Sequence, residues 1–416
     1  MAMQRDERTD GAPGRQDPSL PPVEALILKL YEGAWNGAPK GRGFGRMRLV
    51  STPEGARDLL GDHGTFAKEY DLLTELGRSR FDARGDDWAA RRDLTQPMLR
   101  DAARTARAPE VAAAYAARLD ALGGDEPPER ALLSAAGDIF SAMWGGETSG
   151  DALADWILST RGTARKVQRI AMYGTTRAEL ADLRREVAAM RARADAILAG
   201  DDALAAAVAD MAGRMPPPPP GAAPFDPLSE FLLMLFAGTE TGVSSILWAL
   251  WELGRHPEAQ HRIAAEVEEG GARSPALAVF VQETMRFWPP VPVLTRRVTR
   301  SGARLAGRPV PEGTVLALDI VGLHHDADHW ESPQEFRPDR AEFRDGSWHR
   351  RAYLPFSAGP RVCGGSGLAR LEVHAALAEV LRRFRVRAPS GPSGIEYALT
   401  LRPARPDLIR LEPRDG

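Results

Sequence analysis

Apolar positions along this chain recur mostly at intervals of three and four residues, which predicts a largely helical protein. The clearest pattern is a long apolar run from Pro227 to about Leu253. Asp226 precedes the run as a candidate N-cap, Pro227 occupies the first turn, and Gly254 is expected to end the helix. A run this long and this apolar predicts a buried central helix.

Further elements follow the long run. Helices are predicted for about residues 257–269, 275–287 and 368–384, the first two opened by His-Pro and Ser-Pro pairs. Residues 292–318 carry Val, Leu and Thr between glycine turns and predict short strands, and residues 395–411 predict a strand hairpin. Because no βαβ alternation is visible, the pattern favours a mainly α fold with small β-sheets over a doubly wound one.

Composition limits the possible classes. The 416 residues are 43% hydrophobic with a net charge of -3, which allows a large core and gives no reason to expect nucleic acid or an anionic membrane as a partner. One cysteine excludes an internal disulfide and fits a reducing cytoplasm. Residues 1–22 are polar, with no apolar stretch for a signal peptide or membrane anchor, and are predicted to be a disordered tail. The proline run 216–220 is interpreted as an extended surface spacer.

The single cysteine, Cys363, lies in a glycine-rich segment, residues 356–365 (FSAGPRVCGG), ahead of a predicted helix. A lone cysteine is more often a small core residue. Here the glycines leave room for something flat, Arg361 is two residues away, and the N-terminus of the next helix favours a thiolate. One thiolate binds a soft metal tightly only if other donors fill the remaining positions, and a porphyrin supplies four nitrogens.

The pattern Phe356-x-x-Gly359-x-Arg361-x-Cys363-x-Gly365 matches the haem-binding signature of the cytochrome P450 family. The chain resembles this family from about Trp88 to its C-terminus, through four further motifs in the family's order. The resemblance implies a single domain, residues 23–416, with haem b between the long central helix and the helix after the cysteine segment. It also implies that Cys363 is the thiolate ligand of the haem iron, and that Phe356 and Gly365 contact the cofactor.

A polar segment, residues 237–241 (AGTET), interrupts the long apolar helix. Alone it would be a polar notch at a helix–helix contact. Thr can bond to a carbonyl one turn earlier and Gly weakens the helix, so the backbone can open here and hold water. The segment resembles the family's oxygen-activation motif, which implies that Glu240 and Thr241 are the acid–alcohol pair that delivers protons. The side chains expected to line the substrate space above the haem are Met234, Ala237, Val291, Val293 and Leu294.

Glu283 and Arg286 are three residues apart on a predicted helix and face the same side. Such a pair is usually an ordinary surface pair, but here it is flanked by apolar bulk. It resembles the family's Glu-x-x-Arg pair, and Arg340, in residues 336–340 (FRPDR), matches the family's third member. The resemblance implies a buried structural triad that holds the cysteine segment under the haem.

Several cations are candidates for the two carboxylates of a haem. Trp88 and Arg92 share a face of a predicted helix, which alone is compatible with an ordinary amphipathic helix. The family's corresponding Trp and Arg meet a haem propionate. Arg297 matches a second propionate-binding position, although the neighbouring Arg296 leaves the register open, and Arg361 completes the set.

A histidine cluster in residues 323–329 allows two interpretations. His324, His325 and His329 could form a metal site. The resemblance places this stretch in a helical turn, and the structural interpretation is preferred.

The resemblance implies a soluble, bacterial-type haem-thiolate monooxygenase that inserts one oxygen atom from O2 into an apolar small molecule, in secondary metabolism or in lipid or terpenoid oxidation. No glycine-rich dinucleotide fingerprint follows a strand, so electrons from NAD(P)H are expected from a separate ferredoxin and ferredoxin reductase. Alternatives are an H2O2-driven peroxygenase and a non-catalytic haem-binding protein. The arginines expected on the ferredoxin-docking face are Arg91, Arg92, Arg100, Arg104, Arg107 and Arg370.

Overall fold

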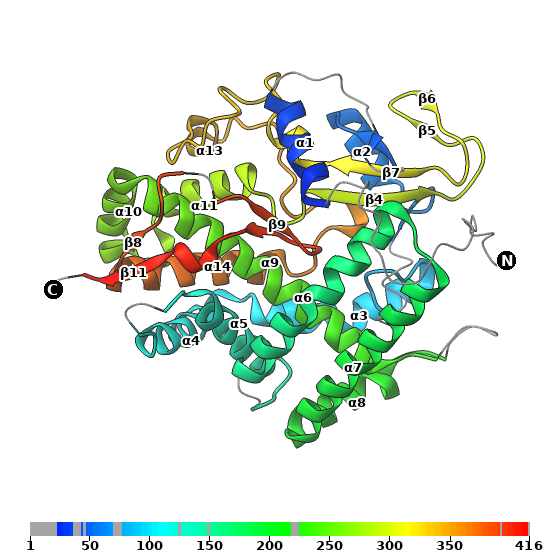
Figure 1. The fold of residues 1–416 in the computed structure, drawn as a ribbon, viewed down its shortest axis with the longest axis horizontal. Coiled ribbons are helices and arrows are strands. Elements are labelled where there is room, and N and C mark those ends of the chain that lie inside the picture. The colour runs from blue at the N-terminus through cyan, green and yellow to red at the C-terminus, as the bar shows by residue number, and fades with distance from the viewer. Residues whose placement is uncertain are drawn as a thin grey trace.

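A computed structural model describes residues 23–35, 43–44, 47–69, 77–123, 126–147, 150–217, 224–391 and 393–414 (Figure 1). The predicted disordered tail, residues 1–22, and residues 218–220 of the proline run lie outside the described residues. Both interpretations therefore stay predictions.

Helix α9 (Pro227–Arg255) runs through the middle of the molecule, and most other helices pack around it (Figure 1). The helices before it are α1 (Val23–Trp35), α2 (Pro53–Gly61), α3 (Gly85–Ala102), α4 (Ala108–Asp120), α5 (Glu129–Met143), α6 (Gly150–Tyr173), α7 (Arg177–Ala199) and α8 (Asp202–Arg214). The helices after it are α10 (Pro257–Gly270), α11 (Pro275–Phe287), α12 (Ile320–His324), α13 (Ala341–Asp345) and α14 (Ser366–Arg383).

The central helix begins as its sequence predicts. The Asp226 side chain accepts a hydrogen bond from the backbone N–H of Ser229, and Pro227 occupies the first turn. By length and composition α9 could cross a membrane, but 78% of its apolar window is buried inside the molecule, as in the core helix of a globular domain. Gly254 does not end the helix. A Cβ there would lie 2.4 Å from the backbone nitrogen of Ala388, so this glycine serves a close approach of two backbones.

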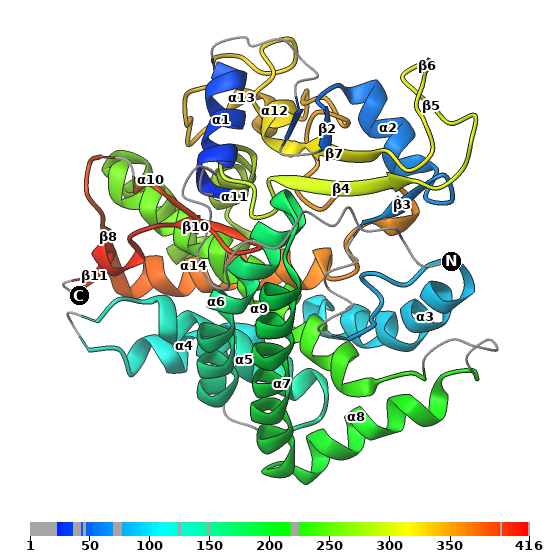
Figure 2. The same cartoon turned by 45° about the vertical axis from the view of Figure 1, so that its right-hand side comes forward.

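One five-stranded sheet lies with α1 and α2 on the opposite side of the molecule from α4, α5 and α8 (Figure 2). Its order is β1-β2-β7-β4-β3, and the β2–β7 pair is parallel while the other pairs are antiparallel. The strands are β1 (Gly43–Phe44), β2 (Met47–Val50), β3 (Phe66–Lys68), β4 (Val293–Val298) and β7 (Val315–Asp319). Three two-stranded sheets pair β5 (Arg304–Leu305) with β6 (Arg308–Pro309), β9 (Ile395–Tyr397) with β10 (Leu401–Pro403), and β8 (Phe384–Arg387) with β11 (Arg410–Pro413).

The structure confirms a mainly α fold with small sheets, and it corrects the C-terminal hairpin. Only β9 and β10 form the hairpin, whereas β11 pairs with β8, which follows α14 directly. Leu411 lies opposite Val386 in this pair, and both side chains are buried in the main hydrophobic core. Burial of these two side chains, which no local pattern reveals, selects the long-range pairing.

Candidate active site

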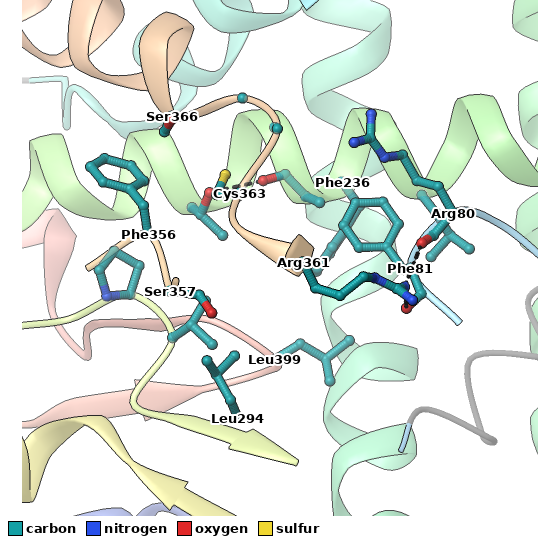
Figure 3. Close-up of a pocket in the computed structure, with 18 of the residues that line it drawn as sticks. Arg80, Phe81, Phe236, Leu294, Phe356, Ser357, Arg361, Cys363, Ser366 and Leu399 are labelled. Atoms are coloured by element: carbon teal, nitrogen blue, oxygen red, sulfur yellow. Dashed lines mark hydrogen bonds between the residues drawn. The ribbon is translucent and has the colours of Figure 1, made fainter. Parts of the chain in front are cut away.

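A cavity of about 1580 Å³ lies inside the molecule, and Cys363 opens into it (Figure 3). The segment from Phe356 to Gly367 forms one wall, and α9 contributes another through Ala237, Gly238 and Thr241. The cavity therefore brings together two segments that are far apart in the sequence and that were both singled out by their composition.

The cysteine segment is held by backbone geometry. Gly359 has a φ of +73°, and a Cβ there would lie 2.2 Å from the Leu60 carbonyl oxygen, so only glycine fits. The backbone N–H of Cys363 donates to the Phe356 carbonyl at 3.0 Å, which closes the loop. Helix α14 begins three residues after the cysteine. The sulfur thus faces the cavity ahead of a helix N-terminus, as the sequence predicts.

Thr241 lines the cavity from α9. Its hydroxyl donates to the Ala237 carbonyl at 2.8 Å, and the hydroxyl of Ser245 donates to the Thr241 carbonyl at 3.0 Å. Nothing lies within 4 Å of where a Gly238 Cβ would be, so this turn of the helix has free space beside it. The predicted back-bonded threonine is present, and the helix is continuous through this turn.

Glu240 is not brought to the cavity. Its carboxylate is buried and accepts two hydrogen bonds of 3.0 Å from the Arg161 guanidinium on α6. Arg161 also pairs with Glu129 at 2.8 Å. Adjacent helical residues point about 100° apart, so Thr241 and Glu240 cannot share one face. The expected acid–alcohol pair is therefore split between the cavity wall and an ion-pair cluster behind it, and the role of Glu240 in proton delivery stays a prediction.

The five side chains predicted to line the substrate space do line the cavity: Met234, Ala237, Val291, Val293 and Leu294. Apolar side chains that the sequence did not single out join them, among them Phe236 from α9 and Leu399 from the turn after β9 (Figure 3). The chamber is therefore largely apolar.

Trp88, Arg92 and Arg361 also meet at the cavity. The guanidinium carbons of Arg92 and Arg361 lie 5.0 and 4.5 Å from the centre of the Trp88 ring. Arg361 also donates to the carbonyls of Ala83, at 3.0 Å, and Arg80, at 3.1 Å. These contacts hold two cations along one edge of the cavity.

The predicted buried triad is formed. Glu283 accepts from Arg286 Nε at 2.6 Å and from Arg340 Nε at 2.7 Å, and all three side chains are fully buried. Arg286 also donates to the carbonyls of His324 and Pro333, at 2.8 and 3.0 Å. The triad thus fastens α11 to the loops that follow α12.

Comparisons with known proteins agree with this geometry. The family model Cytochrome P450 matches residues 228–408. The chain is similar to Leukotriene-B4 omega-hydroxylase 3 of Mus musculus, 34% identical over 195 residues, which cover 43% of this chain and 37% of that protein. It is also similar to Cytochrome P450 3A5 of Homo sapiens, 29% identical over 203 residues, covering 45% and 40%. The matched stretch spans less than half of either relative.

Solved structures extend the likeness along the chain. A cytochrome P450 from Thermus thermophilus covers 94% of this chain and 98% of its own, with a TM-score of 0.71 and 24% identity. A zebrafish cytochrome P450 with progesterone covers 95% and 100%, with a TM-score of 0.72 and 22% identity. At these identities the structures establish the fold. Residues 228–408 thus match the cytochrome P450 family, and nearly the whole chain has the cytochrome P450 fold.

Cytochromes P450 use haem b, and the residues of this cavity fit that group. The sulfur of Cys363 is open to the cavity, and Gly364 and Gly365 present backbone without side chains beside it. Arg92, Arg296, Arg297 and Arg361 line the same cavity and are opposite in charge to the two haem carboxylates. The residues that would hold haem b are therefore Cys363 at the iron, Phe356 and Gly365 beside it, Ala237 opposite, and the cations with Trp88 at the edge.

The charge state of the P450's cysteine needs a correction. A thiolate was expected from the helix N-terminus and the nearby cations. The Gly365 N–H and the cations Lys68, Arg80 and Arg370 do lower the pKa of Cys363, but burial outweighs them and raises it. The surroundings alone favour a thiol, and a metal bound at the sulfur is what would make it a thiolate.

Arg296 and Arg297 both line the cavity. Arg297 forms an ion pair with Glu69 and donates to the Gly313 carbonyl at 3.1 Å, so a propionate would share its guanidinium with Glu69. Arg296, on the opposite face of β4, is 2% exposed. Lys68 lies opposite Arg296 in the antiparallel ladder of β3 and β4, and it also lines the cavity. The sequence analysis did not identify Lys68 as a cavity residue.

The histidine cluster is structural. His324 and His325 are fully buried, and burial lowers the pKa of His324 to about 3. The Nε2 atom of His324 accepts from the Leu354 N–H at 2.8 Å, which ties α12 to the loop before Phe356. No group of three or more metal-ligating side chains occurs among the residues that the structure describes.

Proposed function

We propose that this P450 is a monooxygenase that inserts one atom of O2 into a neutral, apolar small molecule while the other atom becomes water. The observation that carries the proposal is the sulfur of Cys363 lining the same cavity as the hydroxyl of Thr241. Haem held by Cys363 would supply the binding and activation of O2. The protein's own residues then have to exclude water, orient the substrate and move protons.

The lining of the cavity supports a neutral substrate. Three carboxylates line it: Glu69 is paired with Arg297, Asp93 is paired with Arg92 at 2.7 Å, and burial raises the pKa of Glu372 to about 8, so that this group is mostly protonated at pH 7. The α9 wall and β4 add apolar side chains. A cationic substrate would lose its hydration without finding a free carboxylate, and the arginines of the cavity are assigned to the haem carboxylates, whereas an apolar molecule gains by burial.

Thr241 and Glu240 divide the handling of protons between them in this proposal. The Thr241 hydroxyl, held at the Ala237 carbonyl, is placed to orient water in the cavity. Glu240 is paired with Arg161, and it would pass protons on only after a rotation away from that guanidinium. Electrons are proposed to come from NAD(P)H through a separate ferredoxin and its reductase, in the cytoplasm.

The test is turnover by the haem-loaded protein with a surrogate ferredoxin, its reductase and NADPH, on a panel of apolar molecules that shift the haem spectrum. With isotopically labelled O2, the product is expected to carry one labelled oxygen atom. Turnover with H2O2 but not with NADPH and the redox partners would indicate a peroxygenase. Haem reduction without any product across the panel would contradict the monooxygenase proposal and favour a haem-binding protein.

A further inference from the structure

Two arginines lie close to the Cys363 segment. They are Arg80, which lines the cavity beside Gly364, and Arg370 on α14. Arg370 is exposed and lies over the Phe356 ring at 4.5 Å, so water screens its charge. Arg80 is partly buried and lines the cavity (Figure 3). Arg80 is therefore a cation on the cysteine side that water screens less than Arg370.

Arg80 is clamped against the residue that follows the cysteine. Its Nη1 donates to Thr95 Oγ1 at 2.8 Å and its Nη2 donates to Gln96 Oε1 at 3.0 Å, both on α3. The Gln96 amide in turn donates to the Gly364 carbonyl at 2.9 Å. A Cβ on Gly364 would lie 2.7 Å from Arg80 Nη2, so the guanidinium packs directly beside this backbone. The position of the charge is fixed relative to the Cys363 segment.

No carboxylate forms an ion pair with Arg80 among the residues the structure describes, and its two side-chain acceptors are neutral. The acid that acts on it most is Glu230. That carboxylate pairs with Arg91 at 3.1 Å and accepts from the backbone N–H of Arg80 at 3.0 Å. Because Arg91 already balances Glu230, the charge of Arg80 is left to act on the cysteine side of the cavity.

We propose that Arg80 is a positioning residue that sets the reduction potential of the haem site through its charge beside Cys363. This rests on the proposed ligation by Cys363. Reduction adds one negative charge to the site, and a fixed cation in a poorly screened place stabilises the state with the extra electron. The Thr95 and Gln96 clamp keeps the cation at a constant distance, which makes its effect independent of the substrate.

The test compares Arg80→Met and Arg80→Lys with Arg78→Met as the matched control. Arg78 is a nearby surface arginine that pairs with Asp87 at 3.3 Å and is 43% exposed. The reduction potential of the haem-loaded proteins is measured by dye-coupled titration, with haem content and the reduced CO spectrum recorded alongside. Arg80→Met is expected to lower the ratio of reduced to oxidised protein about tenfold at a fixed potential, a shift of about 59 mV for one electron. Arg80→Lys is expected to keep most of the wild-type value, and Arg78→Met all of it.

An unchanged potential in Arg80→Met, with the thiolate-type CO band intact, would overturn the proposal. So would an equal shift in Arg80→Lys, because geometry rather than charge would then be responsible. If Arg80→Met retains no haem, Gln96→Met replaces it. This variant keeps the charge but releases one side of the clamp, and a smaller downward shift is expected, while no shift contradicts the proposal. A wild-type protein without the thiolate-type band would instead contradict the ligation on which the inference rests.

Discussion

In the proposed function, Thr241 is the side chain on which proton handling in the cavity depends most directly. Its hydroxyl is fixed to the Ala237 carbonyl at 2.8 Å, and Glu240, the neighbouring acid, faces Arg161 instead of the cavity. Removal of this hydroxyl is expected to leave the apolar chamber and the cysteine segment intact. The two functions of binding and proton transfer are thus separable at one residue.

Thr241→Ala is expected to bind haem and substrate as before and to divert electrons to H2O2, because water in the cavity loses its anchor. The measurement is H2O2 formed per NADPH consumed, and the expected change is a rise of severalfold. Thr239→Ala is the control, since the Thr239 hydroxyl donates to the Leu235 carbonyl and is buried. An unchanged ratio together with full product yield in Thr241→Ala would remove this residue from the proposed proton path.

Glu372 gives the protein a specific pH dependence. It lies on α14, and no hydrogen-bond or ion-pair partner is found for it in the described part of the chain. Burial raises the pKa of Glu372 from 4.5 to about 8. Between these two pH values the folded protein keeps the proton on this carboxyl, whereas the unfolded chain has released it. Its contribution to the free energy of unfolding therefore falls as pH rises from about 4.5 to 8.

Glu372→Gln is expected to remove a slope of up to about 1.4 kcal/mol per pH unit in this window. Urea unfolding at a series of pH values measures the slope, and Glu412→Gln, at a half-exposed residue of β11, is the control. An identical pH profile for the wild type and Glu372→Gln would show that the Glu372 carboxyl is ionised in the folded protein.

The same residues show what a sequence can and cannot give. Cys363, Thr241 and Glu283 could be predicted because each sits in a short motif whose spacing is local. Arg80 and Lys68 could not, because their neighbours come from α3, α9 and β4 and only the fold brings them to the cysteine. The orientation of Glu240 was missed for a different reason: Arg161 is 79 residues away, and no pattern reveals which face of α9 it meets.

At the scale of elements, α9 and α11 begin where Asp226 and Ser274 predict, and α11 is fastened to the loops beyond it. The side chains of both residues accept hydrogen bonds from N–H groups of the first turn. The β8–β11 pair was not predictable in this way, because its partners are joined only through the folded core. Helix starts are local events, and strand pairing is not.

Arg340→Met should lower the free energy of unfolding by about 3–5 kcal/mol, because it leaves part of the buried Glu283 carboxylate unbalanced. Haem retention should fall with it. The control is Arg337→Met, where the side chain is 38% exposed and pairs with Glu331 at 3.3 Å, and a change below about 1 kcal/mol is expected. Denaturant unfolding measures both, and equal losses in the two variants would contradict a special role for the triad.

At the scale of the whole molecule, the face around α3 is the proposed docking surface for a ferredoxin. The structure removes Arg91 from it, because this side chain is 2% exposed and bound to Asp87 and Glu230. Arg104 and Arg107 are exposed but each lies beside an acid, so the surface is less basic than the sequence suggested. Arg100 is exposed and remains as the central cation of this face.

Arg100→Glu combined with Arg104→Glu is expected to slow haem reduction by ferredoxin at least tenfold at low salt and to leave substrate affinity unchanged. Arg185→Glu, at a 73% exposed residue of α7, controls for net charge. Stopped-flow reduction at several ionic strengths provides the measurement. Rates that match the wild type and do not depend on salt would place electron transfer elsewhere on the molecule.

The central claim is that Cys363 supplies the thiolate that binds the haem iron, and the reduced CO spectrum tests it most directly. The wild-type protein is expected to show the long-wavelength Soret band typical of thiolate ligation, and Cys363→Ser is expected to lose it. Ser357→Ala, in the same segment and also lining the cavity, should keep the band. If Cys363→Ser retains the thiolate-type band, the ligand has been misassigned and the account of this site is wrong.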